Sequence, residues 1–225
     1  MTRELVVAAY DKYLDWLDKI NSDIKVTVYR KGDEEKQRED EIKIEPNKGR
    51  CVHTFFNHIY TNYDNLSDIT FFGQDWPFDH WENIVEVINN GTENLRCQLK
   101  IGGYYGFHFN TITVPSPLGG CMWNLSESKQ FGNGRVLVCQ NDGTPQADPA
   151  HYNINLEEYW KKFFDCEPPT EYEFMPGGHF GITKEHAQLR SKEFYKKVCD
   201  FILEDDAAPW MIERLECYIF NPNIK

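Results

Sequence analysis

Apolar positions in the first ninety residues form either short strand-like runs or runs at helical spacing, and these two patterns alternate along the chain. Unbroken or β-branched runs predict strands at residues 5–10, 25–29 and 69–72, and alternating residues predict one at 41–45. The helical spacing predicts helices at 12–20, 50–63 and 79–90. Asp79 and Glu82 form a capping-box pattern at the start of the last helix, and Asn90-Gly91 is typical of a helix end. This alternation predicts a mostly parallel, Rossmann-like central sheet flanked by helices on both faces.

The second half of the chain has a weaker pattern, because residues 102–134 are rich in glycine, proline and aromatic side chains. It still predicts a strand at 135–139, a strand–turn–strand unit at 172–183, and helices at 155–164, 192–203 and 209–220. We therefore expect a single compact α/β domain over residues 1–225, with a ligand-binding half at 1–100 and a loop-rich half at 101–225.

Charge and cysteine content narrow the expected partners and compartment. The net charge of −12 repels phosphates, which argues against binding to nucleic acid or to anionic membrane surfaces. The seven cysteines are scattered and form no CxxC pair, a pattern typical of free thiols in a reducing compartment, so we expect a cytoplasmic protein. Asp11 and Lys12 interrupt the apolar run near the N-terminus, so we expect neither a signal peptide nor an integral membrane segment.

Candidate chemistry first occurs at the end of the strand predicted at 69–72. Ligands of open α/β sheets bind beyond the carboxyl ends of the strands, and this strand leads into Gly73, Gln74 and Asp75. Gly73 permits a ligand to approach the backbone, and Asp75 could coordinate a divalent cation that bridges a diphosphate. The alternative is structural: Gln74 and Asp75 cap a turn, and Asp79 only caps its helix.

A second candidate site precedes the helix predicted at 50–63, in the sequence PNKGR. The N-terminus of a helix presents free N–H groups and the positive end of the helix dipole. Gly49 permits close approach of a ligand, and Arg50 can bind a phosphate with two hydrogen bonds. In the alternative interpretation, Asn47 is a simple N-cap and Arg50 a surface charge.

Two more positions in the second half could contribute. The glycine pair before His179 admits either an unusual turn or a ligand, so Gly178 and His179 could contact a sugar or a phosphate. Glu213 lies in an otherwise apolar helix and could act as a general base, or it could be a structural glutamate in an ion pair.

The sequence lacks the P-loop, the GxSxG nucleophile elbow, the HExxH zinc motif and the GxGxxG dinucleotide motif. The segments LVVAAY, VYRKG and PNKGRCVHTFFNHIYTNYDNLSDITFFGQD, followed by GGHFGITKEH and WMIERLECYIF, together resemble a glycosyltransferase-like domain family of GT-A type with no assigned activity. The resemblance covers roughly residues 5–90 and 172–220, and 95–170 show none.

The resemblance implies a function and a set of roles. The protein would transfer a sugar from a nucleoside-diphosphate sugar, UDP- or GDP-linked, to a hydroxyl of a carbohydrate or glycoconjugate acceptor. Donor-binding positions would be Tyr10, Asn47, Gly49, Arg50, Gln74 and Gly178, the catalytic ones Glu213 and His179, and Asp75 would hold Mn²⁺ or Mg²⁺. The family's usual Asp-x-Asp reads Gly73-Gln74-Asp75 in this chain, which puts the metal dependence in question.

Two other functions remain open from the residues alone. One is a metal-dependent hydrolase of phosphate or sugar-phosphate esters, with Asp75, Asp79, His80 and His179 around a cation. The other is a non-catalytic carbohydrate-binding module, because twelve tyrosines and six tryptophans supply many rings on which sugars could stack.

Overall fold

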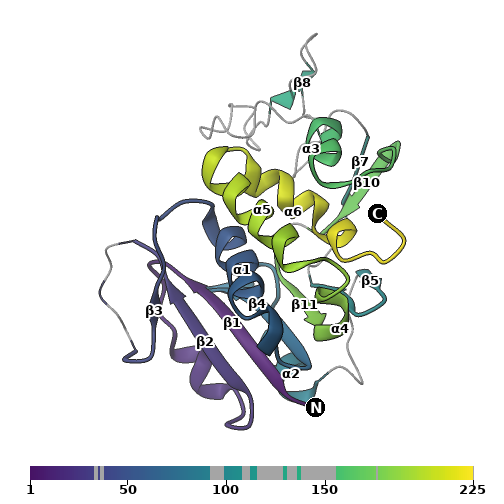
Figure 1. The fold of residues 1–225 in the computed structure, drawn as a ribbon. Helices are drawn as coiled ribbons and strands as arrows, with labels where there is room; N and C mark the ends of the chain where they lie inside the picture. The colour runs from purple at the N-terminus through teal and green to yellow at the C-terminus, as the bar shows by residue number, and fades with distance from the viewer. Residues whose placement is uncertain are drawn as a thin grey trace.

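A mixed sheet forms the centre of the fold (Figure 1). The computed structural model describes residues 1–32, 35, 38–91, 99–107, 112–115, 129–130, 136–137, 156–175 and 177–224. Within them the central sheet has the order β3-β2-β1-β4-β11-β6-β5. Its strands are β1 (Arg3–Ala9), β2 (Lys25–Arg30), β3 (Ile42–Lys43), β4 (Ile69–Gln74), β5 (Leu99–Ile101), β6 (Tyr104–Gly106) and β11 (Phe180–Thr183).

The sheet is parallel on one side and antiparallel on the other. Strands β3, β2, β1 and β4 pair in parallel, whereas β11 is antiparallel to β4 and β6, and β5 is antiparallel to β6. A mostly parallel sheet therefore holds only for the part built from the first 74 residues. Strand β11 comes from the second half of the chain, so both halves contribute to one sheet.

The unbroken apolar run of β1 follows from burial on both faces. Successive side chains of a strand point to opposite faces, and here they enter two different hydrophobic clusters. Val6 and Ala8 belong to the larger cluster, and Leu5, Val7 and Ala9 to the smaller.

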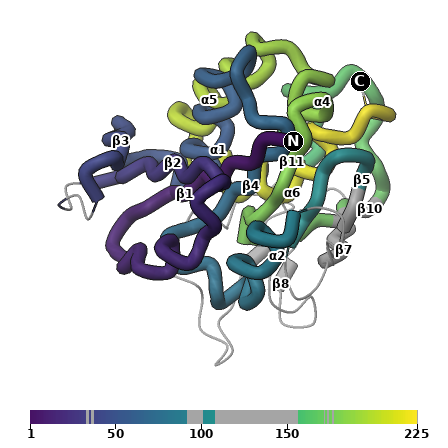
Figure 2. Tube along the Cα trace, turned by 90° about the horizontal axis from the view of Figure 1, so that it is seen from below, coloured from purple at the N-terminus to yellow at the C-terminus, as the bar shows by residue number. Residues whose placement is uncertain are grey.

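Helices cover both faces, as predicted (Figure 2). The larger cluster lies under α1 (Arg50–Thr61), α5 (Lys192–Glu204) and α6 (Ala208–Ile219), and α1 packs against the other two. The smaller cluster lies under α2 (Ile84–Asn90) and the 3-10 helix η1 (Asp15–Lys19). Shorter elements complete the description: η2 (Tyr63–Asn65), η3 (Pro77–Asp79), β7 (Ile112–Pro115), β8 (Lys129–Gln130), β9 (Val136–Leu137), α3 (Leu156–Phe163), β10 (Glu171–Phe174) and α4 (Lys184–Ala187).

Both strands predicted at 172–183 are present, as β10 and β11, but they do not pair with each other: β10 pairs with β7 in a separate sheet and β11 enters the central sheet. The capping box predicted for Asp79 and Glu82 does not form. Pro77 starts the short helix η3, which Asp79 ends, and α2 begins only at Ile84 without a side-chain cap.

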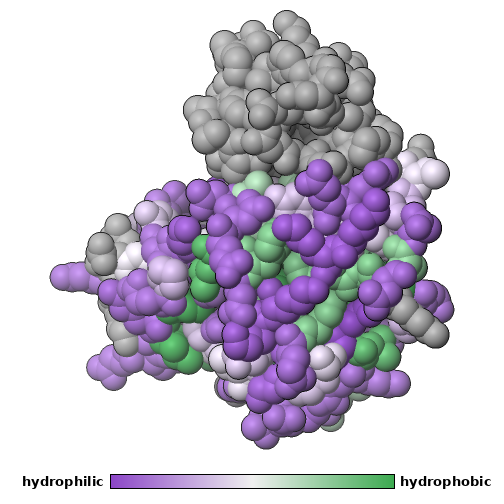
Figure 3. All heavy atoms as spheres, turned by 45° about the horizontal axis from the view of Figure 1, so that its top comes forward, coloured by the Kyte–Doolittle hydropathy of each residue, from purple (hydrophilic) through white to green (hydrophobic). Residues whose placement is uncertain are grey.

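The face shown in Figure 3 is mainly polar. Hydrophilic side chains cover most of its described surface, with hydrophobic ones in narrow areas between them. Across the described ranges, none of the helices combines the length and the apolar character needed to cross a bilayer.

A buried ion pair fastens the carboxyl end of β2. The Arg30 guanidinium donates two hydrogen bonds to Glu41, from Nε to Oε2 at 2.8 Å and from Nη2 to Oε1 at 2.9 Å. Its Nη1 donates to the main-chain carbonyl of Tyr10 at 2.6 Å. Both partners are almost fully buried, so this pair ties the segments after β1 and before β3 together.

We expect Arg30→Met to lower the free energy of unfolding, measured by urea denaturation, by about 3–5 kcal/mol, because the Glu41 carboxylate stays buried without its cation. The double variant Arg30→Met/Glu41→Leu should recover most of this loss. Arg38→Met is the control, because the ion pairs of Arg38 with Asp18 and Asp40 are exposed and should be worth about 0–1 kcal/mol. Equal losses in the two single variants would contradict the assignment.

Candidate functional site

The strand order creates a topological switch between β1 and β4. From β1 the chain continues to β2 and β3 on one side, and it then returns to place β4 on the other side of β1. Crevices for ligands form outside the carboxyl ends of strands at such a switch point. Tyr10 and Asp75 follow these two ends directly, and β11, antiparallel to β4, brings Gly178 and His179 to the same edge.

The Asp75 carboxylate is used for structure. Its Oδ2 accepts hydrogen bonds at 2.9–3.1 Å from three backbone N–H groups, those of Tyr10, Asp11 and Lys12. Its Oδ1 accepts one from the backbone N–H of Trp76 at 3.0 Å. The residue is 9% exposed. Asp75 therefore fixes the loop after β1 against the end of β4, as the structural interpretation of its sequence position had it.

The residues expected around a cation do not fit one. Four backbone donors occupy the Asp75 carboxylate, and Asp79 is exposed to solvent. His80 packs instead against His179, with ring centroids 5.7 Å apart. In the described part of the chain, no group of three or more His, Cys, Asp or Glu side chains is arranged to hold a metal ion. We therefore derive no chemical step through a metal.

The start of α1 has an unusual backbone. Gly49 is its N-cap with φ 74°, and Arg50 follows with φ 51°, so Asn47 is not the cap. A Cβ at Gly49 would lie 2.3 Å from Cγ2 of Ile202 and 2.6 Å from Cβ of His53, so only glycine fits. The exposed Arg50 guanidinium lies 4.2 Å from the ring centroid of Trp210, a cation–π contact that ties α1 to α6.

Tyr10 and Asn47 meet at Gly32, which follows β2. A Cβ at Gly32 would lie 3.0 Å from Cε2 of Tyr10 and 3.2 Å from Nδ2 of Asn47. Both side chains are exposed. Two residues predicted to bind the donor, 37 positions apart in the sequence, therefore lie at one place on the carboxyl edge of the sheet.

Positive charge gathers at the start of α1. Lys31, only 4% exposed, donates to the main-chain carbonyl of Lys48, and its Nζ lies 3.5 Å from Nδ1 of His53. Burial lowers the pKa of Lys31 to about 8, against the effect of Cys51 and Glu45. The first turn of α1 contains no acidic residue. Lys31, Arg50 and the helix dipole therefore favour an anion here, although the protein as a whole is acidic.

The glycine turn before β11 is held by two site residues. The backbone N–H of Gly177 donates to Oε1 of Glu213 at 3.0 Å, and its carbonyl accepts from Nε2 of Gln74 at 2.9 Å. The Gln74 amide also lies 3.6 Å from Sγ of Cys51. Gly178 borders the same thiol, because a Cβ there would lie 4.0 Å from Sγ. Gln74, Gly178 and Glu213 therefore surround one turn, next to the start of α1.

Burial raises the pKa values of the two titratable side chains beside this turn, Glu213 and Cys51. It raises the pKa of Glu213 above its ordinary value, which Arg214, the Gly177 N–H and Arg50 partly offset. It also raises the pKa of the Cys51 thiol to about 12, with a further contribution from Glu213. Glu213 thus has the direction of shift expected of a general base working near neutral pH, whereas Cys51 stays a neutral thiol.

His179 takes a different position from the one expected. Its side chain is fully buried, and its ring lies among those of His80 and Trp81, with centroid distances of 5.7 and 6.3 Å. This packing does not support direct contact between His179 and a sugar.

Sequence reasoning left out Lys31 and Trp210 as site residues. The signal for Lys31 was present, because it directly follows a strand in the same way as Tyr10 and Asp75 do. Trp210 gave none, because only the packing of α6 beside α1 places its ring under Arg50.

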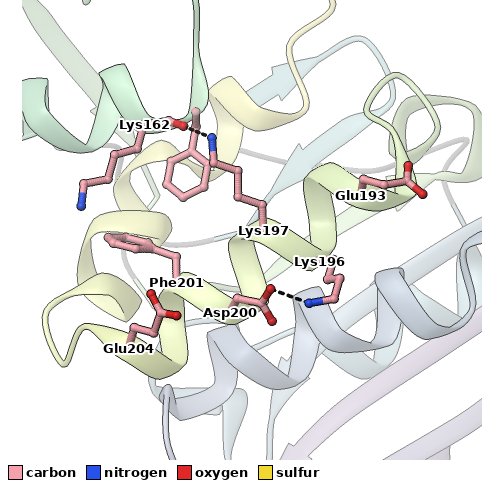
Figure 4. Close-up of a pocket in the computed structure, with 8 residues that line it drawn as sticks. Lys162, Glu193, Lys196, Lys197, Asp200, Phe201 and Glu204 are labelled. Atoms are coloured by element: carbon pink, nitrogen blue, oxygen red, sulfur yellow. Dashed lines mark hydrogen bonds and ion pairs between the residues drawn. The ribbon is translucent and has the colours of Figure 1, made fainter.

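An open groove elsewhere contains none of these residues (Figure 4). It has a volume of about 460 Å³ and is lined by α3 and α5, with Lys162, Lys197 and Phe201 among its residues. Three lysines and three acidic residues line it, so its charge favours no particular ligand.

Comparison with known proteins gives a family. Residues 5–223 match the model of a family described as "Protein of unknown function (DUF3431)". No curated protein matches the chain significantly, and no solved structure does.

Gly49→Ala should lower the free energy of unfolding by more than about 2 kcal/mol, because it combines a strained φ with a collision against Ile202 and His53. Ile202→Ala is the companion variant, because it removes the Cγ2 atom with which a Cβ at Gly49 would collide. If this collision matters, the double variant Gly49→Ala/Ile202→Ala should lose less free energy of unfolding than the two single losses added together. Urea unfolding of the three variants checks this, and losses that simply add would refute the packing argument.

Burial and the nearby Lys31 lower the pKa of His53 from 6.5 to about 4. Between these two pH values the unfolded chain binds the proton and the folded chain does not, so this histidine makes unfolding easier as pH falls. Glu213 and Glu216, whose pKa values are raised, act in the opposite direction, so the comparison needs a variant.

His53→Gln removes the His53 contribution alone. We expect the free energy of unfolding of the wild type, minus that of His53→Gln, to decrease as pH falls from about 6.5 to about 4. Chemical denaturation across this range measures it. A difference that stays constant with pH would show that His53 is not buried in the neutral form.

Proposed function

Because the chain belongs to the family of unknown function DUF3431, we propose its activity from the candidate site: it is a glycosyltransferase that moves a hexose or pentose from a nucleoside-diphosphate sugar to an acceptor hydroxyl. In this proposal the parallel strands β3-β2-β1-β4 form the Rossmann-like, GT-A-like part that binds the donor. The free thiols of Cys51, Cys166, Cys199 and Cys217 support a reducing compartment, the cytoplasm.

One observation carries the proposal. Exposed residues that suit a nucleotide and buried residues that suit proton transfer lie at the same edge of the sheet. Tyr10 and Asn47 meet at Gly32 and offer a ring and an amide to a base, while the exposed Arg50 offers its guanidinium to a diphosphate and the buried Lys31 adds positive charge nearby. The buried carboxylate of Glu213 is near them, because Glu213 follows Trp210 by about one turn of α6 and the Trp210 ring contacts Arg50.

The reaction would proceed by displacement at the anomeric carbon. Glu213 would take the proton of the acceptor hydroxyl while the acceptor oxygen bonds to the anomeric carbon and the bond to the diphosphate oxygen breaks. The hydrogen bond from the Gly177 N–H would keep the Glu213 carboxylate oriented. The negative charge that develops on the leaving diphosphate would be stabilised by Arg50 and by the N–H groups that start α1.

This proposal assigns the charge stabilisation to cationic side chains. A dependence on Mn²⁺ or Mg²⁺ remains a prediction, and the ligands for such a cation would have to come from the substrate or from residues other than Asp75. Adding manganese to the binding measurement tests this point directly.

The proposal predicts that a nucleoside diphosphate raises the melting temperature of the protein, because a ligand that binds only the folded state stabilises it. The measurement is a thermal-shift screen against UDP, GDP, CDP and their common sugars, with and without manganese. Arg50→Ala should weaken the binding of the active nucleotide about tenfold or more, as expected for charge-assisted hydrogen bonds. Arg3→Ala, which changes an arginine at the opposite, amino end of β1, should bind the nucleotide normally.

Glu213→Gln should keep the nucleotide shift and lose turnover by about 10²–10⁴-fold, as for removal of a general base. Sugar transfer to saccharide acceptors, or slow hydrolysis of the donor, measures it. A protein that binds none of the nucleotides, or an Arg50→Ala variant that binds them as well as the wild type, would overturn the donor site.

A further inference from the structure

Exposed aromatic side chains gather beside the candidate site. Tyr10, Tyr13 and Trp76 are 51%, 77% and 45% exposed, and all three follow the carboxyl end of β1 or of β4. Exposing large rings to water is costly, so several of them after two adjacent strand ends indicate a place where something binds.

The two segments that carry these rings are fixed to each other by one carboxylate. Asp75 accepts hydrogen bonds from the backbone of residues 10–12 on Oδ2 and from the backbone of Trp76 on Oδ1. The backbone under the rings is therefore ordered before any ligand arrives. A surface ordered in advance loses less conformational entropy on binding.

The Trp76 indole also packs against other aromatic rings on its inner side. Its ring packs edge-on against Phe78 with centroids 4.9 Å apart, and Phe78 packs against Trp16 at 5.7 Å. The Trp16 indole donates a hydrogen bond to the main-chain carbonyl of Asp75 at 2.8 Å. A row of aromatic rings thus links Trp76 to the interior while nearly half of its surface stays open.

The three rings divide into two groups by their neighbours. Tyr10 turns toward Gly32 and Asn47, the donor side of the proposed site. Tyr13 follows the three residues whose backbone binds Asp75, and Trp76 follows Asp75 itself; we term Tyr13 and Trp76 the aromatic platform. Asp11 and Asp79, close to them in the sequence, are exposed, and Lys12 forms an ion pair with Asp11 at 3.5 Å.

These charges select the class of ligand. A phosphorylated or nucleic-acid ligand would be repelled by the carboxylates and by the net charge of −12. A neutral sugar ring suits both features, because its apolar face can stack on an indole while its hydroxyl groups donate to carboxylates.

We propose that the aromatic platform binds a pyranose ring of a neutral oligosaccharide, the acceptor of the proposed transferase. This names the acceptor class of that site and so rests on the proposed function. Binding of the saccharide is measured separately from binding of the nucleotide, so the two proposals can fail independently.

The test uses the full chain labelled with 5-fluorotryptophan, which reports each of the six tryptophans by ¹⁹F NMR. The Trp76 signal is the one lost in Trp76→Phe. The protein is titrated with cello-, malto-, manno- and chito-oligosaccharides at millimolar concentration. We expect one of them to shift the Trp76 signal to saturation, with the signals of the buried Trp16 and Trp81 little changed.

Variants separate stacking from structure. Trp76→Ala and Tyr13→Ala should each weaken saccharide binding, measured by calorimetry, about five- to tenfold, whereas Trp76→Phe keeps a ring and should retain most of it. Leu189→Ala is the matched control, because Leu189 has the same 45% exposure but lies in the turn after α4. The nucleotide-induced rise in melting temperature should be unchanged in Trp76→Ala.

Each result decides between the proposals. A Trp76 signal that no saccharide moves, or equal binding by wild type and Trp76→Ala, overturns the platform even if a nucleotide binds. A saccharide that binds at Trp76 in a protein with no affinity for nucleotides leaves the platform in place and overturns the transferase.

Discussion

The Asp75 carboxylate is the contact on which the site depends. Its four hydrogen bonds from backbone N–H groups join the loop after β1 to the end of β4 at the topological switch of the sheet. A carboxylate that accepts several backbone donors is held strongly, since these bonds are charge-assisted. The same contact sets the positions of Tyr10 on the donor side and of Trp76 on the platform. Asp75, which the sequence suggests as a metal ligand, therefore has a structural role.

Charge is distributed unevenly around Asp75. Arg50 and the buried Lys31 lie at the start of α1, whose first turn contains no acidic residue, and the buried Glu213 acts on Cys51 of that turn. The exposed carboxylates of Asp11 and Asp79 lie in the segments after β1 and β4, close in sequence to Tyr13 and Trp76. The start of α1 therefore favours an anion, and the segments that carry Tyr13 and Trp76 favour a neutral polar molecule.

Much of the local structure could be predicted because the signals were local. The apolar run at residues 5–10 and the helical spacing at 50–63 became β1 and α1, since burial on two faces and on one stripe leaves these two patterns. The capping box at Asp79 failed because Pro77 started a 3-10 turn that used the same residues. The two strands at 172–183 were predicted, but not their partners, because strand pairing is not local: β11 pairs with β4, far earlier in the chain, and not with its neighbour β10.

The sequence by itself determined that this is an α/β chain with a net negative charge, and it marked the strand end at Asp75 and the helix start at Arg50 as places for chemistry. These follow from periodicity, charge and the free groups at element ends, all of which can be read over a few residues. Only the tertiary structure decided what each residue does there. Whether Asp75 meets a cation or four N–H groups, and whether His179 faces solvent or the rings of His80 and Trp81, depends on segments far apart in the chain. Side-chain roles at a site are set by such long-range packing, which leaves no periodic trace in the sequence.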